Sequence, residues 1–289
     1  MQLTFPHANL FRSYKHLGAI NMTNNANLIE ALPKVALGNT GLNVSRLSFG
    51  TGSNGWQGRS NQSDLGIDQL ASLLQLAYEH GVNFWDSADA YGTHPHIARA
   101  LKNIPRNEVF ILTKTLSQKA KDVSGDIERF LKELDTDYID IVLLHVMTQI
   151  DWPNRYGEAM VVLSKAQKEG KIRALGVSCH SYNALKACLD TDWCQVVMAR
   201  INYAGVNMDA SPEEVEPILE KLYQSGRAVY GMKILGNGHL SNNVHAAIRY
   251  ALNLGTIHAI TIGMENQKQL MDDIRFVREF YEERRETNA

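Results

Sequence analysis

The chain has 289 residues, and its 29 basic and 31 acidic side chains leave a formal net charge of −2. Because these charges are mixed along the chain, no strong positive field forms, which argues against nucleic acid or an anionic membrane as the main partner. The three cysteines, Cys179, Cys188 and Cys194, form no C-x-x-C pair. Their odd number indicates a reduced, intracellular chain without a disulfide framework or structural zinc.

Residues 1–33 differ from the rest of the chain. Residues 22–27 are polar, and the segment before them lacks an apolar core of signal-peptide length. We therefore expect an N-terminal extension; a disordered arm is the preferred interpretation, and an oligomer contact or a start site placed too early are the alternatives. Because no window of the sequence approaches a membrane span, we expect a cytoplasmic protein.

From residue 34 onward, helical patterns alternate with short apolar runs. Apolar residues at i, i+3 and i+4 predict helices over residues 67–80, 94–103, 123–134, 156–168, 182–189, 212–224, 244–254 and 267–284. After a first strand that ends near Gly50, the runs predict strands over 82–86, 109–114, 138–145, 172–177, 195–201, 228–233 and 258–262. This alternation indicates parallel strands joined by right-handed crossovers. Eight such units in one domain (residues 34–289) favour a closed barrel, although counting alone leaves an open sheet as an alternative.

Four polar residues follow the ends of three successive strand runs: Asp86, Tyr91, Lys114 and His145. In a barrel or sheet of parallel strands, the carboxyl ends of the strands form a single rim, where such side chains converge. Each residue alone has an ordinary structural explanation, such as a helix cap, a surface phenol, a solvated amine or a buried imidazole. Together and in this order they predict a shared site.

These four residue types suit the reduction of a carbonyl group. Hydride addition needs a proton for the developing alkoxide, and a phenol with a pKa near ~10 is a poor donor unless its anion is stabilised. We expect Lys114 to lower the pKa of Tyr91 and Asp86 to keep that lysine charged and oriented. A neutral His145 N–H would orient the carbonyl oxygen. Tyr91 is therefore the predicted general acid.

Residues 86–92, which read Asp-Ser-Ala-Asp-Ala-Tyr-Gly, together with Lys114 and the Leu-Leu-His sequence that ends at His145, resemble the aldo-keto reductases. Residues 37–52 resemble the opening hairpin and first strand of that family, and residues 168–178 resemble its fifth strand. The resemblance covers roughly residues 34–285. It implies an α/β fold, a (β/α)8 TIM barrel with an N-terminal β-hairpin and a C-terminal helix. It also implies a nicotinamide cofactor across the rim and reversible reduction of aldehydes or ketones.

The resemblance places the cofactor contacts at Gly50, Thr51, Asp86, Ser178, Met232, Gly236, Gly238, Gly263, Lys268, Asp272 and Asp273. The chain departs from the family pattern at several of these positions or next to them. Cys179 replaces a common Asn, Met198 a common Gln, and Met232 the Tyr that stacks on the nicotinamide. Gln269 stands where an Arg often clamps the 2′-phosphate of NADP. By family prevalence the expected cofactor is NADP(H), with NAD(H) as its rival.

Trp56 and Trp152, with His145, are the predicted substrate contacts, and core or lid packing is the alternative for both tryptophans. The partner is expected to be a small carbonyl or alcohol, and the protein a monomer or small homo-oligomer. No metal is expected, because His94 and His96 lack an acidic or thiol partner at ligand spacing. The alternative function is a regulatory or scaffold protein that binds a nicotinamide nucleotide on the same barrel without catalysis.

Overall fold

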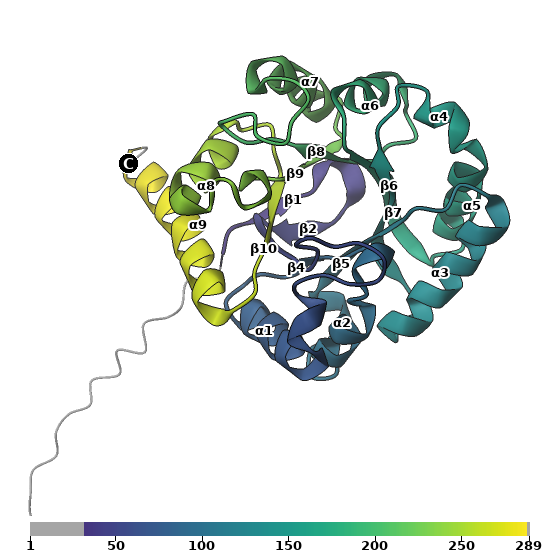
Figure 1. Cartoon of the computed structure of the whole chain (residues 1–289), viewed down its shortest axis with the longest axis horizontal. Helices are drawn as coiled ribbons and strands as arrows, with labels where there is room; N and C mark the ends of the chain where they lie inside the picture. Colours follow the sequence, from purple (N-terminus) through teal and green to yellow (C-terminus); the bar gives the residue numbers. More distant parts are fainter. Residues whose placement is uncertain (1–31, 288–289) are drawn as a thin grey trace, which may run out of the picture. The chain divides into compact units, whose positions relative to one another are not determined.

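The computed structural model describes residues 32–287, in which eight parallel strands close into a barrel surrounded by helices (Figure 1). The neighbour order around the barrel is β10-β3-β4-β5-β6-β7-β8-β9. The strands are β3 Leu47–Gly50, β4 Phe84–Asp86, β5 Phe110–Thr115, β6 Ile139–Met147, β7 Ile172–Cys179, β8 Val196–Arg200, β9 Ala228–Met232 and β10 Ala259–Gly263. The predicted (β/α)8 barrel is therefore confirmed, and the open-sheet alternative is wrong.

Each predicted helix forms, with ends that differ from the prediction by a few residues. The helices are α1 Ile67–Glu79, α2 His94–Leu101, α3 Ala120–Leu134, α4 Trp152–Arg155, α5 Gly157–Lys168, α6 Tyr182–Ala187, α7 Pro212–Gln224, α8 Val244–Asn253 and α9 Gln267–Thr287. Helix α7 matches its prediction at both ends, because Ser211 and Glu214 form a capping box and Pro212 occupies the first turn. The single-turn helix α4 was not predicted, since four residues are too few to show a helical period.

An antiparallel hairpin, β1 (Lys34–Ala36) and β2 (Asn43–Ser45), closes the amino-terminal end of the barrel. The backbone N–H of Asn39 donates to the Gly226 carbonyl just before β9, and Ser45 N–H donates to Asn83 Oδ1 just before β4. Because the hairpin covers this end, the carboxyl ends of the strands form the open face of the barrel. That face is where active sites lie in barrels of this kind.

Two clusters of buried apolar side chains stabilise the barrel. One lies inside it and joins hairpin residues such as Leu37 and Val44 to strand residues such as Phe84 and Leu143. The other lies between the strands and the surrounding helices, and it includes Leu32. Because Leu32 is 2% exposed within this core, the last part of the predicted extension packs with the barrel. The rest of that extension, residues 1–31, lies outside the described residues.

Candidate active site

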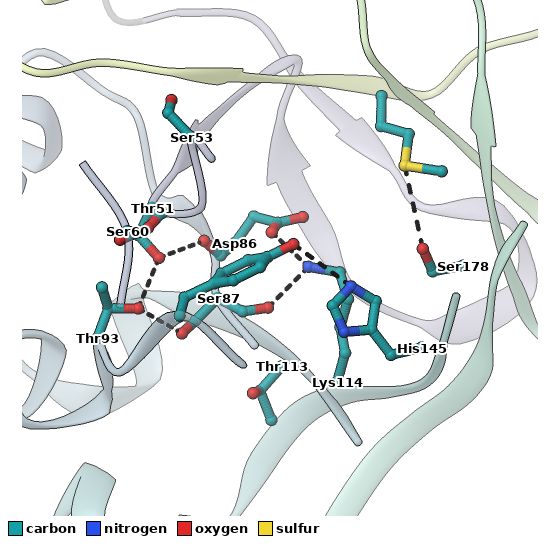
Figure 2. A network of polar contacts seen from close by, with 12 residues as sticks. Thr51, Ser53, Ser60, Asp86, Ser87, Thr93, Thr113, Lys114, His145 and Ser178 are labelled. Carbon is teal, nitrogen blue, oxygen red and sulfur yellow. Dashed lines mark hydrogen bonds and ion pairs between the residues drawn. The ribbon is translucent and has the colours of Figure 1, made fainter. Parts of the chain in front are cut away.

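The four predicted catalytic residues meet at the carboxyl ends of β4, β5 and β6. Asp86 is the last residue of β4, Lys114 lies in β5, and His145 lies in β6. The buried Lys114 ammonium donates to Asp86 Oδ1 at 2.6 Å and to the Ser87 carbonyl at 2.7 Å, as Figure 2 shows. It lies 5.0 Å from the centre of the Tyr91 ring, and the Tyr91 hydroxyl lies 3.4 Å from His145 Nε2.

The charge states of the tetrad follow from burial and from these contacts. Burial alone would lower the pKa of Lys114, but Asp86 and Tyr91 together outweigh this effect and raise the pKa, so the lysine is charged. Burial, reinforced by Lys114, holds the pKa of His145 well below its usual value, and the imidazole is neutral. The prediction that Lys114 lowers the pKa of Tyr91 holds only in part, because burial dominates and the net pKa of the phenol is raised.

A strained backbone sits directly after His145. Val146 has φ of +62°, and the register between β6 and β7 shifts between Leu144 and Met147. Positive φ is rare for a β-branched residue, and a bulge re-aims the side chains beside it. This irregular backbone therefore directly follows the residue whose ring contacts Tyr91. Such strain is found where the surrounding structure holds a functional group in place.

The loop between β3 and α1 packs against the Tyr91 ring. A Cβ atom at Gly52 would overlap ring carbons Cε2 and Cζ of Tyr91, and one at Gly55 would overlap Cδ1. These two glycines therefore let the backbone lie against the phenol. The ring is held between this loop on one side and the Lys114 ammonium and His145 on the other.

We expect Gly52→Ala to reduce turnover by about 100-fold, because displacing the acid by ~1 Å costs on the order of that factor. Steady-state kinetics on the variant would measure the loss. The matched control is Gly125→Ala in α3, where an added Cβ meets nothing within 4 Å. Equal activity of the two alanine variants would contradict a positioning role for the loop.

Hydroxyl groups behind the tetrad fix the backbone of Asp86. Thr51 Oγ1 donates to the Asp86 carbonyl at 2.9 Å and lies 2.8 Å from Thr93 Oγ1, which in turn lies 2.7 Å from Ser87 Oγ (Figure 2). Thr51, a predicted cofactor contact, is fully buried in this network. Its contacts assign it to the support of Asp86, and it does not line the cavity described next.

A cavity of about 380 Å³ opens beside the tetrad and is lined by Asp86 and Tyr91. Its volume falls in the range of small-molecule and cofactor sites. Among the predicted cofactor contacts, Gly50, Asp86, Gly238 and Gly263 line it, as does Met198. Gly236, Ser178 and Met232 do not line it. Ser178 Oγ lies 4.0 Å from Met232 Sδ, and both side chains are buried.

His180, which the sequence analysis missed, links Ser178 to a cation. Arg200 donates to His180 Nδ1 at 3.1 Å, and because a guanidinium only donates, the proton of the neutral ring must be on Nε2. That N–H donates to Ser178 Oγ at 3.1 Å. Burial and then Arg200 lower the pKa of His180 to about 3, so the ring stays neutral. Ser178 Oγ therefore accepts from His180 and donates its own proton to the Met232 sulfur at 4.0 Å.

Lys233 is a second residue that the sequence analysis did not single out. It follows β9 directly, has φ of +59°, and lines the cavity. Its ammonium donates to Asn237 Oδ1 at 2.9 Å. Burial, together with Arg200 and Lys114, lowers the pKa of Lys233. Lys233 stands alone after β9, with no neighbouring motif in the sequence that would predict its place in the cavity.

The two predicted substrate tryptophans occupy different environments. Trp56 is 55% exposed, in the loop that packs on Tyr91. Trp152 is 1% exposed, and its indole N–H donates to the Ala184 carbonyl at 3.1 Å. Trp152 belongs to the apolar core between the strands and the surrounding helices. Its environment therefore agrees with the packing alternative, and Trp152 is not proposed as a substrate contact.

The acidic pair predicted near the adenine also lies away from the cavity lining. Asp272 pairs with Lys268 at 2.5 Å and with Arg275 at 3.1 Å. Asp273 is buried against the body of the barrel, and burial, with the neighbouring Asp272, raises its pKa to about 7. These contacts correct the prediction for Asp273, which lies on the buried face of α9 and does not line the cavity.

The raised pKa of Asp273 predicts a pH-dependent stability. Between about pH 4 and 7 the folded state keeps a proton that the unfolded state has lost, so stability falls as the pH rises through this window. Asp273→Asn should therefore raise the free energy of unfolding at pH 8 by roughly 1–4 kcal/mol and have little effect near pH 4. Urea denaturation at both pH values would measure this. Asp137→Asn, at an exposed site, is the control and should change neither value; a pH-independent effect of Asp273→Asn would contradict the account.

A model of the aldo/keto reductase family matches residues 46–251 of the chain. This chain belongs to the aldo/keto reductase family. Its tetrad therefore lies in the fold and at the barrel end that the resemblance implied. Between residues 32 and 287 no group of three histidine, cysteine or carboxylate side chains is placed to hold a metal ion. Within the same part of the chain, no helix has both the length and the apolar character needed to cross a bilayer.

Curated relatives include reductases and a dehydrogenase. Probable aldo-keto reductase 1 of Glycine max is 32% identical over 160 residues, which cover 50% of this chain and 44% of the relative. L-galactose dehydrogenase of Arabidopsis thaliana is 30% identical over 154 residues, covering 50% and 47%. Methylglyoxal reductase DkgA of Escherichia coli K12 is 27% identical over 206 residues, covering 66% and 73%. The chain spans about half the length of the first two relatives.

Solved structures of aldo-keto reductases share the fold. The holo form of AKR11C1 from Bacillus halodurans superimposes with a TM-score of 0.70 at 22% identity, over 85% of this chain and 91% of that one. AKR2E4 of Bombyx mori, solved in complex with NADP, gives a TM-score of 0.64 at 20% identity, over 85% and 88%. At these identities the likeness concerns the barrel architecture.

Proposed function

We propose that this protein is an oxidoreductase that interconverts an aldehyde or ketone and its alcohol with a nicotinamide cofactor, using Tyr91 as general acid and base. The observation that carries the proposal is the buried ion pair of Lys114 and Asp86 beside the Tyr91 ring, with a neutral His145 next to the phenol hydroxyl. Family membership and the names of the relatives support the same class of reaction.

The cavity beside the tetrad fits a dinucleotide. Four of its lining residues, Gly50, Gly52, Gly238 and Gly263, leave backbone as wall where side chains would fill the space. Thr261 Oγ1 is buried at this wall with no hydrogen-bond partner within residues 32–287. The glycines and Thr261 would hold the cofactor from one side. When bound, reduced nicotinamide supplies the hydride to the carbonyl carbon.

The tetrad performs the proton chemistry. The neutral His145 N–H is placed to hydrogen-bond the carbonyl oxygen beside the Tyr91 hydroxyl, which orients the substrate. Tyr91 then gives its proton to the developing alkoxide. The Lys114 ammonium stabilises the resulting phenolate, and Asp86 holds that ammonium in place. The reverse direction uses the phenolate as the base, so the same residues oxidise an alcohol.

Small carbonyl compounds are the proposed substrates. Methylglyoxal reductases from Escherichia coli are among the relatives, including an enzyme named as NADH-specific, and the dehydrogenase relative is named for L-galactose. The exposed Trp56, which follows Gly55 in the loop that packs on Tyr91, offers an aromatic contact that supports loose selection of substrate. The predicted oligomeric state and cytoplasmic location stay predictions.

The test is to incubate the full chain with NADH or NADPH and a panel of small aldehydes and ketones while following the absorbance of the reduced nicotinamide. Carbonyl-dependent oxidation of the cofactor is the expected result. Binding of the cofactor without oxidation by any substrate would favour the alternative, a non-catalytic nucleotide-binding protein. The apolar Met198 at the cavity wall is the feature that agrees with this alternative.

A further inference from the structure

We infer that the cavity selects NAD(H) over NADP(H), and that the Glu265 carboxylate makes this selection. The inference rests on the proposed function, because it requires a nicotinamide dinucleotide in this cavity. Family prevalence placed NADP(H) first. The residues that line the cavity at the end of β10 and the start of α9 favour NAD(H).

This wall belongs to the same cavity as the tetrad. Thr261 and Gly263 of β10, Glu265 in the following loop, and Gln269 in the first turn of α9 line the cavity together with Asp86 and Tyr91. A dinucleotide whose nicotinamide lies at the tetrad therefore extends toward these residues. Because the family resemblance puts the 2′-phosphate clamp at the position of Gln269, which lines this wall, we place the adenosine ribose there.

The Glu265 side chain is held at this wall by its neighbours. Its Oε1 accepts from Asn61 Nδ2 at 2.8 Å, which ties it to the loop that packs on Tyr91. Its backbone N–H donates to Gln269 Oε1 at 2.7 Å. Between residues 32 and 287, Glu265 Oε2 makes no hydrogen bond. The carboxylate thus keeps one oxygen available as an acceptor for a ligand hydroxyl.

Positive charge is missing where a 2′-phosphate would need it. Of the cavity-lining residues within the described part of the chain, Lys233 is the only cation, and it lies on the loop after β9. Lys268 has a side chain that is 86% exposed and is paired with Asp272, which also pairs with Arg275. Gln269, at the position of the family's phosphate-clamping arginine, is neutral. Lys268 and Arg275 are therefore both directed to Asp272, and neither lines the cavity.

The amino terminus of α9 is partly capped by its own sequence. Helix N-termini attract anions through free backbone N–H groups. Here Asn266 Oδ1 accepts from the Gln269 N–H at 3.0 Å. One of the donors that a phosphate would use is thus already occupied.

NAD(H) and NADP(H) differ only at the 2′ position of the adenosine ribose, where one has a hydroxyl group and the other a phosphate. A ribose 2′-hydroxyl donates a hydrogen bond, and an acidic residue that accepts it is a general device of NAD sites. A 2′-phosphate is an anion with several acceptor oxygens, so beside a carboxylate it gains no hydrogen bond and meets like charge. The Glu265 side chain therefore attracts NAD(H) and repels NADP(H).

The experiment is an equilibrium titration of the full chain with NADH and with NADPH, followed by nicotinamide fluorescence. NADH should bind at least about tenfold more tightly than NADPH, as expected when like charges face each other. Competition with ADP-ribose and 2′-phospho-ADP-ribose would confirm that the difference arises at the 2′ position, without any contribution from the nicotinamide or from turnover.

Glu265→Gln should tighten NADPH binding by about tenfold and change NADH binding less, because it removes the repulsion and keeps an acceptor oxygen. The control is Glu282→Gln, which makes the same charge change within α9, about 22 Å from the start of the helix, and should leave both affinities unchanged. The double variant Glu265→Gln/Gln269→Arg, which adds a planar fork for phosphate, should reverse the preference.

The outcomes separate this inference from the proposed function. Tighter binding of NADPH than of NADH by the wild type, or an unchanged ratio in Glu265→Gln, would overturn the selection by Glu265 and leave the oxidoreductase proposal standing. Failure of the folded wild type to bind either cofactor would overturn both. Circular dichroism of each variant would establish that an affinity change does not come from unfolding.

Discussion

Tyr91→Phe should lower the turnover of carbonyl reduction by about 10²- to 10⁴-fold, the range that a positioned general acid contributes. The phenylalanine ring keeps the contacts with Gly52 and Gly55, so the fold and the cavity are retained, and cofactor affinity should change little. Steady-state kinetics and a cofactor titration on the same preparation would measure both quantities. The account would be contradicted by a variant that retains wild-type turnover.

Tyr223→Phe is the control for this substitution. Tyr223 lies in α7, is 41% exposed, and stacks on His258 away from the cavity. It should retain full activity. The pH profile gives a second check: because burial raises the pKa of Tyr91, the acid remains protonated at neutral pH, and reduction should not decline through its titration below about pH 10.

Lys114→Met should remove turnover and also destabilise the fold by about 3–5 kcal/mol, because it leaves the buried Asp86 carboxylate without its counter-charge. Chemical denaturation would measure the loss of unfolding free energy. The large stability effect distinguishes this position from Tyr91, whose hydroxyl contributes to chemistry and little to folding.

The double variant Asp86→Asn/Lys114→Met separates the two roles of the ion pair. Because both charges are removed together, the free energy of unfolding should recover most of the loss seen in Lys114→Met. Activity should not recover, since no ammonium remains beside Tyr91. Recovery of activity in the double variant would show that the lysine acts only by holding the fold together.

The barrel and the tetrad were predictable because both leave local signals. Each predicted helix carries its own apolar period, and the capping box at Ser211 marks the start of α7 in the sequence. The tetrad residues each follow a strand run, and parallel strands bring their carboxyl ends to one face. Order and spacing therefore sufficed to place Asp86, Lys114 and His145 together.

Other features of the site depend on tertiary contacts that no local pattern encodes. The position of the Lys233 side chain in the cavity depends on a positive φ after β9, and the neutral state of His180 depends on Arg200 in the next strand. Trp152 and Asp273 were placed in the site because of their position in the chain, but both are buried against the core. Burial also reverses the expected net direction of the Tyr91 pKa.

The most direct test of the central claim is transfer of deuterium from a cofactor deuterated at C4 of the reduced nicotinamide to the carbonyl carbon of a small aldehyde, detected in the alcohol by mass spectrometry. The account predicts deuterium at that carbon with the wild-type chain and a loss of the labelled product with Tyr91→Phe. Label-free alcohol, or no alcohol from a chain that binds the cofactor, would contradict the assignment of hydride transfer to this site.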